Sequence, residues 1–168
     1  ISRSDWSSDV CSSDHSGANW KYSEIETDQI DYIMPYVESH YNVSTTAEGR
    51  AYAGLSMGGS TTSNMLMHHT ELFGYYGIWS YANVDGSFGG VEGITSQSVR
   101  DHLSSLTVKP KIMLAAGNWD FGMAAVKTFG ENLSELGLDY SYLQVPAAHD
   151  WECWQLTFAN AAENFLWK

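Results

Sequence analysis

The segment Gly54-Leu55-Ser56-Met57-Gly58 constrains the fold of this chain more than any other feature. It matches the pattern G-x-S-x-G, in which a serine follows a strand, occupies a sharp turn and precedes a helix. Residues 50–55 form a short buried strand by their apolar character, and residues 57–69 have the length of a helix. A Cβ at the flanking glycines would collide with the neighbouring strand and helix. The pattern therefore predicts a strand–turn–helix unit that holds the Ser56 hydroxyl above a sheet edge.

Strand-like and helix-like segments alternate along the rest of the chain. Pro35 interrupts the first helical pattern and predicts a kink or break there, and the glycine-rich residues 83–93 predict a surface loop. The alternation predicts an α/β fold with a mostly parallel sheet flanked by helices. The predicted strands cover residues 75–82, 111–116 and 140–145, and the predicted helices cover residues 23–41, 96–106, 121–136 and 151–167.

His149 is the predicted partner of Ser56. A serine hydroxyl is a weak nucleophile unless a base accepts its proton, and an acid must orient that base. In folds with this serine turn, the acid and then the histidine follow the serine along the chain. Only His149 lies in a loop after the last predicted strand. The other histidines precede the serine or lie in predicted helices: His15, His40, His68, His69 and His102.

Asp120 is the predicted acid. Ligands bind beyond the carboxyl ends of the strands in an open parallel sheet, and Asp120 follows the predicted strand 111–116 at that edge. Asp85 follows the strand 75–82 in the same way and remains the alternative. Asp139 precedes its strand, and Asp101 lies in a predicted helix.

Met57 is the predicted oxyanion-hole donor, because its backbone N–H opens the helix after Ser56, where the helix dipole favours negative charge. No metal site is predicted. The patterns HExxH and CxxC are absent from the sequence, and His68 and His69 are adjacent. Adjacent residues on a helix do not face the same point. We therefore expect chemistry without a metal or another cofactor.

The charge of the chain restricts its partners. Eight basic and twenty acidic residues give a formal charge of −12, whereas a nucleic-acid-binding surface needs a clustered basic face. We therefore expect no nucleic-acid partner. Apolar runs such as residues 112–117 are too short to cross a bilayer, so we expect no membrane partner either.

Residues 1–14 differ from the rest of the chain. They show no apolar periodicity, and DWSSDVCSSD at residues 5–14 reads as the in-frame translation of a common sequencing-adapter oligonucleotide. We expect this segment to be non-native, with a native serine-rich linker as the alternative, and exclude it from the fold. Without its one basic and three acidic residues the charge is −10, and Cys153 has no second cysteine to pair with. Residues 15–168 are then the C-terminal part of one domain.

Three segments resemble the family of α/β-hydrolase esterases that includes feruloyl esterases, acetylxylan esterases and enterochelin esterase-like proteins. They are AGLSMGG at residues 53–59, AGNWD at 116–120 and HDWECW at 149–154. The last, a histidine followed by D-W-x-x-W, is the most specific to the family. The resemblance covers residues 19–168. It implies Ser56 as nucleophile, Asp120 as acid and His149 as base, in agreement with the argument from strand position.

The resemblance also implies an N-terminally truncated domain. A complete domain of this family has several strands before the serine turn, and their first loops supply a second oxyanion donor, whereas few residues precede Ser56 here. The expected fold is thus an α/β-hydrolase sheet that lacks its first strands.

The expected activity is that of a serine esterase acting on a small-molecule or polysaccharide-linked ester, with feruloyl or acetyl esters of plant polysaccharide as candidates. Trp119, Trp151 and Trp154 are the predicted substrate-binding residues, although aromatic residues after His149 can equally pack the last helix. The alternatives are an acyltransferase on the same fold, an inactive truncated fragment and a non-catalytic binding module. The sequence leaves the compartment open, secretion included, and gives no oligomeric state.

Overall fold

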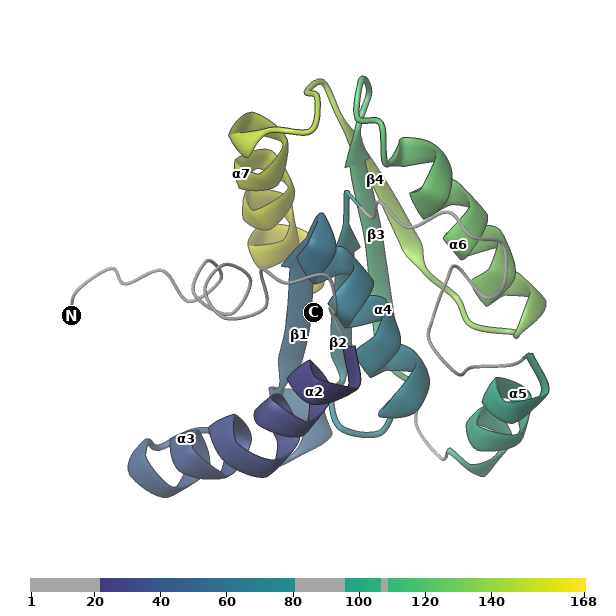
Figure 1. Cartoon of the computed structure of the whole chain (residues 1–168). Coiled ribbons are helices and arrows are strands. Elements are labelled where there is room, and N and C mark those ends of the chain that lie inside the picture. Colours follow the sequence, from purple (N-terminus) through teal and green to yellow (C-terminus); the bar gives the residue numbers. More distant parts are fainter. Residues whose placement is uncertain (1–21, 81–95, 107–108) are drawn as a thin grey trace.

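A sheet of four parallel strands forms the centre of the molecule, and helices cover both of its faces (Figure 1). The computed structural model describes residues 22–80, 96–106 and 109–168. The strands lie in chain order: β1 (Ala51–Leu55), β2 (Tyr75–Trp79), β3 (Lys111–Gly117) and β4 (Ser141–Val145). This arrangement confirms the predicted α/β fold with a mostly parallel sheet.

Side chains of β3 alternate between two apolar clusters, one on each face of the sheet. Ile112 and Leu114 contact a cluster that includes residues of α4 (Met57–His68) and α6 (Met123–Glu135). Met113 and Ala115 contact the opposite cluster, which includes Ala161 of the π-helical segment η4 (Ala161–Phe165). Burial on both faces explains the continuous apolar run in the sequence of this strand.

Helix α7 (Trp151–Asn160) leads into η4 and lies across the sheet from α4 and α6 (Figure 1). Because β1 to β4 run in parallel and in chain order, right-handed crossovers place the connecting helices α4 and α6 on one face. The chain then continues from β4 onto the other face. Helix α5 (Ser96–Ser105) precedes β3.

The predicted helix over residues 23–41 consists of three segments: α2 (Tyr22–Thr27), η1 (Asp28–Ile33) and α3 (Met34–His40). Pro35 lies in the first turn of α3. In a regular helix its ring would clash with the carbonyl four residues earlier. The π-helical η1 immediately before it widens the turn, so the interruption predicted at Pro35 takes this form. A short 3₁₀ turn, η2 (Ala47–Gly49), precedes β1.

Three predicted boundaries are wrong by a few residues. Strand β2 ends at Trp79 because Ser80 turns the chain with a φ of +49°. Helix α6 begins at Met123 rather than at residue 121, because the Gly122 N–H donates to the Asp120 carboxylate in the preceding turn. The last helix changes to π geometry after Asn160. Three features lie outside the described residues: residues 1–14, the predicted loop 83–93 and Asp85. In the described part of the chain, every helix is too short or too polar to cross a membrane.

Candidate active site

Ser56 lies in the turn between β1 and α4, as predicted. Its φ of 54° and ψ of −118° lie outside the regions that non-glycine residues usually occupy. The backbone N–H of Ser56 donates to the Trp79 carbonyl at 2.9 Å and so extends the ladder between β1 and β2. The strained turn thus begins at a fixed point and presents the half-buried Ser56 side chain at the carboxyl end of the sheet.

Gly54 allows the start of α4 to approach β1 closely. A Cβ at this position would lie 2.2 Å from the Gly58 carbonyl oxygen, well inside van der Waals contact. The backbone of the first turn of α4 therefore occupies the space of a side chain. This contact explains physically why the G-x-S-x-G pattern has a glycine two residues before the serine.

His149 lies in the loop between β4 and α7. Its Nδ1 is 2.9 Å from Asp120 Oδ1, and its Nε2 is 2.9 Å from Ser56 Oγ. A carboxylate can only accept, so Nδ1 carries the proton and Nε2 accepts the Ser56 hydroxyl proton. The neighbouring Asp150 accepts from the Cys153 N–H and caps α7. The first residues of the HDWECW segment therefore combine the histidine with a helix N-cap.

Asp120 follows β3, and its carboxylate is fully buried. The Oδ1 atom accepts from His149 Nδ1 and from the Gly122 N–H at 2.7 Å, and Oδ2 accepts from Ser80 Oγ at 2.5 Å. Burial alone would raise the pKa of Asp120, but these donors hold the pKa below its ordinary value. Asp120 is therefore ionised at neutral pH and can orient and stabilise a protonated His149.

The loops that carry Asp120 and His149 are held together by backbone hydrogen bonds. The Asn118 N–H donates to the Val145 carbonyl at 2.8 Å, and the Trp119 N–H donates to the Ala147 carbonyl at 3.1 Å. Gly117 lies beneath this contact, where a Cβ would be 2.2 Å from the Ala147 oxygen. The distance between the carboxylate and the imidazole is thus fixed by the backbone on both sides.

Met57 is the first residue of α4, and its side chain is 52% exposed. The first N–H groups of an α-helix have no partner within the helix, and the helix dipole places partial positive charge there. The Met57 N–H therefore lies directly after Ser56, at the positive end of the α4 dipole.

The three predicted substrate-binding tryptophans have different environments. Trp119 and Trp151 are 72% and 63% exposed. Trp154 is half-buried and packs against a small cluster of Val145, Ala147 and Cys153. Its ring also contacts the rings of His149, at 5.6 Å between centroids, and Trp151, at 5.0 Å. Trp154 therefore does pack the last helix, whereas the exposed rings have area available for a ligand.

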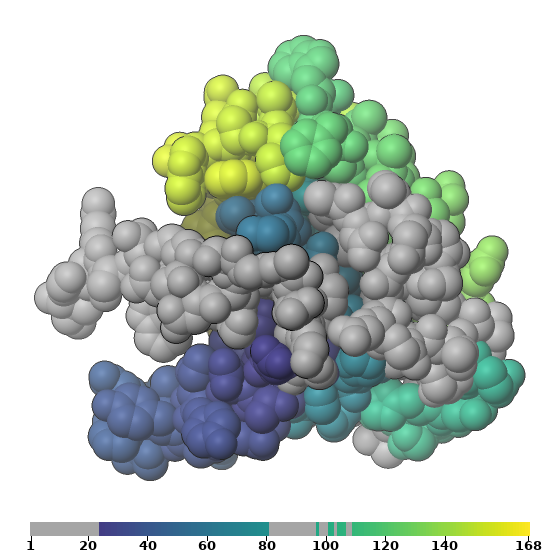
Figure 2. Space-filling model, viewed as in Figure 1, coloured from purple at the N-terminus to yellow at the C-terminus, as the bar shows by residue number. Residues whose placement is uncertain are grey.

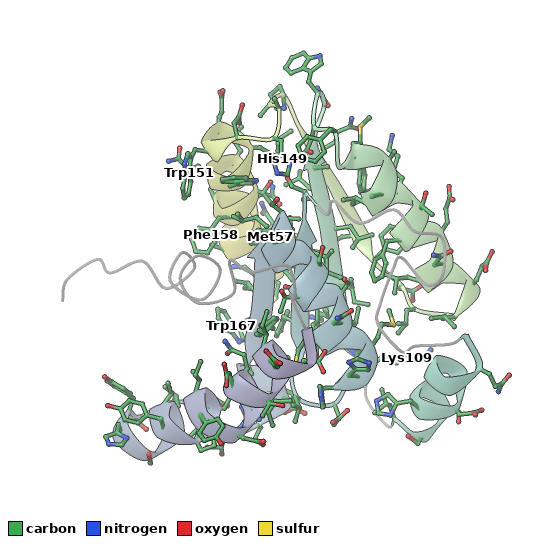
Figure 3. All side chains as sticks on the ribbon, in the orientation of Figure 1. Met57, Lys109, His149, Trp151, Phe158 and Trp167 are labelled. Atoms are coloured by element: carbon green, nitrogen blue, oxygen red, sulfur yellow. The ribbon has the colours of Figure 1, made fainter. Side chains whose placement is uncertain are left out.

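The site occupies one end of the molecule. Figure 2 shows the yellow residues of α7 and the green residues after β3 side by side at this end, with blue residues below them. In Figure 3, His149, Trp151 and Met57 lie at this end, whereas Lys109 lies at the other. Among residues 22–80, 96–106 and 109–168, no group of three His, Cys, Asp or Glu side chains could hold a metal ion.

Sequence reasoning did not identify Ser80 or Phe121. The Ser80 hydroxyl contacts Asp120, and the Phe121 ring lies 4.1 Å from the His149 ring between centroids. The sequence placed Ser80 inside the predicted strand 75–82, where a serine gives no sign of contact with the acid. Phe121 gave no signal either, since an aromatic residue at the start of a predicted helix usually packs the core.

The family described as "Putative esterase" matches residues 2–165. Among curated proteins, an endo-1,4-beta-xylanase/feruloyl esterase of Xylanibacter ruminicola is 37% identical over 57 residues, which is 34% of this chain and 8% of the relative. A ferulic acid esterase from Anaeromyces mucronatus, solved in complex with ferulic acid, has a TM-score of 0.70 and 28% identity, and the match covers 88% of this chain and 54% of that one.

The S-formylglutathione hydrolase of Staphylococcus aureus has a TM-score of 0.71 and 20% identity, over 86% of this chain and 62% of that one. At this identity the likeness shows a shared fold. The chain therefore spans less than two thirds of the length of the solved relatives that it matches, and a small part of the curated relative.

Proposed function

Because the chain belongs to the putative esterase family, we propose that it acts as a serine esterase on carboxylic esters, with Ser56 as nucleophile, His149 as general base and Asp120 as the acid that orients it. One observation carries this proposal. Hydrogen bonds connect Ser56 Oγ to His149 Nε2, and His149 Nδ1 to the buried, ionised Asp120. A nucleophile, a base and an acid in this order are the working parts of a serine hydrolase.

In the proposed reaction, Ser56 Oγ attacks the ester carbonyl carbon while its proton moves to His149 Nε2. The carbonyl oxygen becomes an oxyanion and accepts from the Met57 N–H. When this intermediate collapses, the alcohol leaves with the proton from Nε2. Water then attacks the acyl-serine and gives a proton to His149 Nε2. The carboxylic acid product is released, and the proton returns from His149 to Ser56 Oγ.

The substrate class proposed is a feruloyl or acetyl ester carried by a sugar or polysaccharide. The exposed rings of Trp119 and Trp151 lie next to the loop of His149, and such faces suit an aromatic acyl group or a sugar ring. The ferulic acid and feruloyl esterases among the relatives support the same class. In a Trp151→Ala variant, kcat/KM should fall further for methyl ferulate than for p-nitrophenyl acetate.

A covalent probe tests the nucleophile directly. The 168-residue chain is treated with a fluorophosphonate, and the modified residue is located by mass spectrometry. We expect labelling at Ser56, none in Ser56→Ala, and normal labelling in Ser63→Ala, whose hydroxyl lies further along α4 and donates to the Ser60 carbonyl. A chain that neither takes up the probe nor hydrolyses p-nitrophenyl acetate, alone or extended with upstream sequence from its gene, would contradict the proposal.

Product analysis separates the proposal from related chemistry. An esterase yields the free acid in water, whereas an acyltransferase yields a new ester when an alcohol acceptor is added. Phosphatase activity that Ser56→Ala abolishes would refute the assignment to carboxylic esters.

A further inference from the structure

Two serines in this molecule have the same unusual setting. Ser56 follows β1 with a φ of 54°, and Ser80 follows the neighbouring β2 with a φ of 49°. The N–H of each donates to the next strand, Ser56 to the Trp79 carbonyl at 2.9 Å and Ser80 to the Ala115 carbonyl at 2.8 Å. One serine contacts the imidazole of His149, and the other contacts the carboxylate of Asp120.

We propose that Ser80 is a positioning residue for the catalytic acid: its hydroxyl fixes Oδ2 of Asp120, so that Oδ1 stays directed at His149. This inference rests on the function proposed above. It extends the triad by one residue, into a chain of hydrogen bonds that runs from Ser56 through His149 and Asp120 to Ser80.

The direction of the hydrogen bonds follows from the chemistry of the groups. An ionised carboxylate has no proton to give, so the Ser80 hydroxyl donates to Oδ2. The Cys153 Sγ lies 3.7 Å from Ser80 Oγ. Because the only hydroxyl proton of Ser80 points at Asp120, the thiol is the donor in this contact. Burial raises the pKa of Cys153, which keeps the thiol protonated as this direction requires.

The backbone of Ser80 shows why a serine is notable at this position. Its side chain is fully buried, and its positive φ is one that glycine adopts without strain. A serine in this conformation costs free energy that a glycine would not. The hydroxyl offsets that cost through its contact with a buried charge, because hydrogen bonds to charged groups are stronger than those between neutral groups.

A second reading is that Ser80 only fills the core. Two variants distinguish the readings, because Ser80→Ala removes the hydroxyl and keeps the strained φ, whereas Ser80→Gly removes both the hydroxyl and the strain. If the hydroxyl positions Asp120, the two variants should have the same catalytic defect although their stabilities differ. Ser63→Ala is the matched control, since Ser63 is an equally buried serine whose hydroxyl donates to a backbone carbonyl.

The first measurement is the rate of fluorophosphonate labelling against pH. We expect both Ser80 variants to label about ten- to a hundredfold more slowly than the wild type, as the loss of a hydrogen bond to a charged group predicts. The acidic midpoint of the rate should also move to higher pH. With one donor fewer, the Asp120–His149 pair binds a proton more tightly. The titratable groups that face Asp120 are His149, Tyr142 and Cys153.

The second measurement needs no turnover. The proton on His149 Nδ1, which donates to Asp120, should give a downfield ¹H NMR resonance, assigned by its loss in His149→Gln. We expect both Ser80 variants to shift or broaden this resonance and Ser63→Ala to leave it unchanged. Three results for the Ser80 variants would overturn the role of Ser80. They are labelling at the wild-type rate, an acidic midpoint that does not move, and slower labelling at every pH with an unchanged resonance.

The two measurements also separate this inference from the proposed function. If the wild type, alone or extended with upstream sequence, neither labels at Ser56 nor hydrolyses the ester, the proposed function fails, and the resonance still decides whether Ser80 holds the Asp120–His149 pair.

Discussion

Asp120 and Glu26 each bind a histidine, and the two pairs lie at opposite ends of the same helix. Asp120 binds His149 beside Ser56, where α4 begins. Glu26 of α2 binds His68, the last residue of α4, with both of its oxygens, at 2.7 and 2.9 Å from Nδ1. The twelve residues of α4 separate these ends by about 18 Å. The pairs are chemically alike, but their surroundings differ.

The difference begins with the helix dipole. The N-terminal end of α4 favours negative charge, as a developing oxyanion requires, whereas the C-terminal end favours positive charge, as a protonated histidine supplies. His69, at 3.6 Å from Glu26, adds a second imidazole at the C-terminal end. One end of the helix is therefore suited to charge that appears during a reaction, and the other to a permanent contact between α2 and α4.

The second difference between the two pairs is the partner on the other side of the imidazole ring from the carboxylate. The Nε2 atom of His149 accepts from a serine in a strained turn, and the backbone on both sides fixes its position. A carboxylate–histidine pair is thus common to both ends, and the serine beside an anion-stabilising helix start distinguishes the candidate active site. Four predictions test this comparison.

The largest expected effect is on catalysis at the N-terminal end. Ser56→Ala should lower kcat for an aryl ester by about three to six orders of magnitude, because the parts of a triad act as a unit. Glu26→Gln should leave kcat within about threefold, since its pair lies at the far end of α4 and has no part in the reaction. If Glu26→Gln abolished activity in a chain that stays folded, the two ends would be coupled and the comparison would fail.

The second prediction concerns the two candidate acids. Asp120→Asn should lower kcat by about two to four orders of magnitude, less than Ser56→Ala, because an amide N–H in place of an acceptor reverses the hydrogen bond to Nδ1. Asp85→Asn should have a mild effect. The measurement is kcat on one aryl ester for both variants. If Asp85→Asn is the impaired variant, the acid follows β2, one strand closer to Ser56 than β3, and the assignments of Ser56 and His149 stand.

The third prediction concerns stability rather than catalysis. Here the contact of Glu26 with His68 and His69, at the C-terminal end of α4, should have the larger effect. Burial alone would raise the pKa of Glu26, but hydrogen bonds from His68 and His69 lower it below its ordinary value. Glu26→Gln should cost about 1–3 kcal/mol at pH 7, less than a fully buried pair because both histidines are partly exposed. This loss corresponds to a fall in Tm of about 2–10 °C.

The sign of the pH dependence follows from the lowered pKa of Glu26. A carboxyl group whose pKa is lower in the folded state stabilises the fold above its unfolded pKa, about 4.3, and this contribution is lost as pH falls through the folded value. The wild-type Tm should therefore fall more steeply than that of Glu26→Gln below about pH 4–5, as calorimetry would show. Parallel curves for the two proteins would contradict the assigned role of Glu26.

The same comparison explains what could be predicted from the sequence. Strand–helix alternation and the G-x-S-x-G pattern predict the fold and the position of Ser56, because both depend on short-range periodicity and on close contact at Gly54. The positions of Asp120 and His149 follow from one topological rule, that the carboxyl ends of parallel strands share an edge. These features need no knowledge of side-chain packing.

The pair of Glu26 with His68 and His69 could not be predicted in this way. Glu26 is three residues after Ser23, a capping-box spacing, yet it lies within a helix and contacts a residue 42 positions later. The expectation that His68 and His69 face different points is also wrong. Helix α4 ends at His68, so His69 leaves the helical geometry at a φ of −134° and also reaches Glu26. Long-range contacts of this kind depend on helix ends, which sequence locates poorly.

The smallest expected effect concerns the rings around His149. The Phe121 ring lies 4.1 Å from the imidazole between centroids and the Trp154 ring 5.6 Å, whereas His68 has an edge contact with His69 at 6.1 Å. In the proposed reaction His149 accepts the Ser56 proton and becomes a cation, which an aromatic face attracts. Phe121→Leu should therefore lower kcat by about two- to tenfold, the worth of one aromatic pair. Its Tm should change little, since Phe121 is 71% exposed.

Phe121→Tyr is the matched control for this last prediction, because it keeps the ring face and should keep kcat. The kinetic constant that changes decides the role of the ring. A ring that stabilises the imidazolium lowers kcat when it is lost, whereas a ring that only holds substrate raises KM. A rise in KM alone in Phe121→Leu would move Phe121 from the environment of the base to the substrate surface beside Trp119. Equal kcat and KM in the wild type, Phe121→Leu and Phe121→Tyr would show that the contact between Phe121 and His149 has no role in catalysis. His149 would then differ from His68 only in its contact with Ser56 and in its position at the N-terminal end of α4.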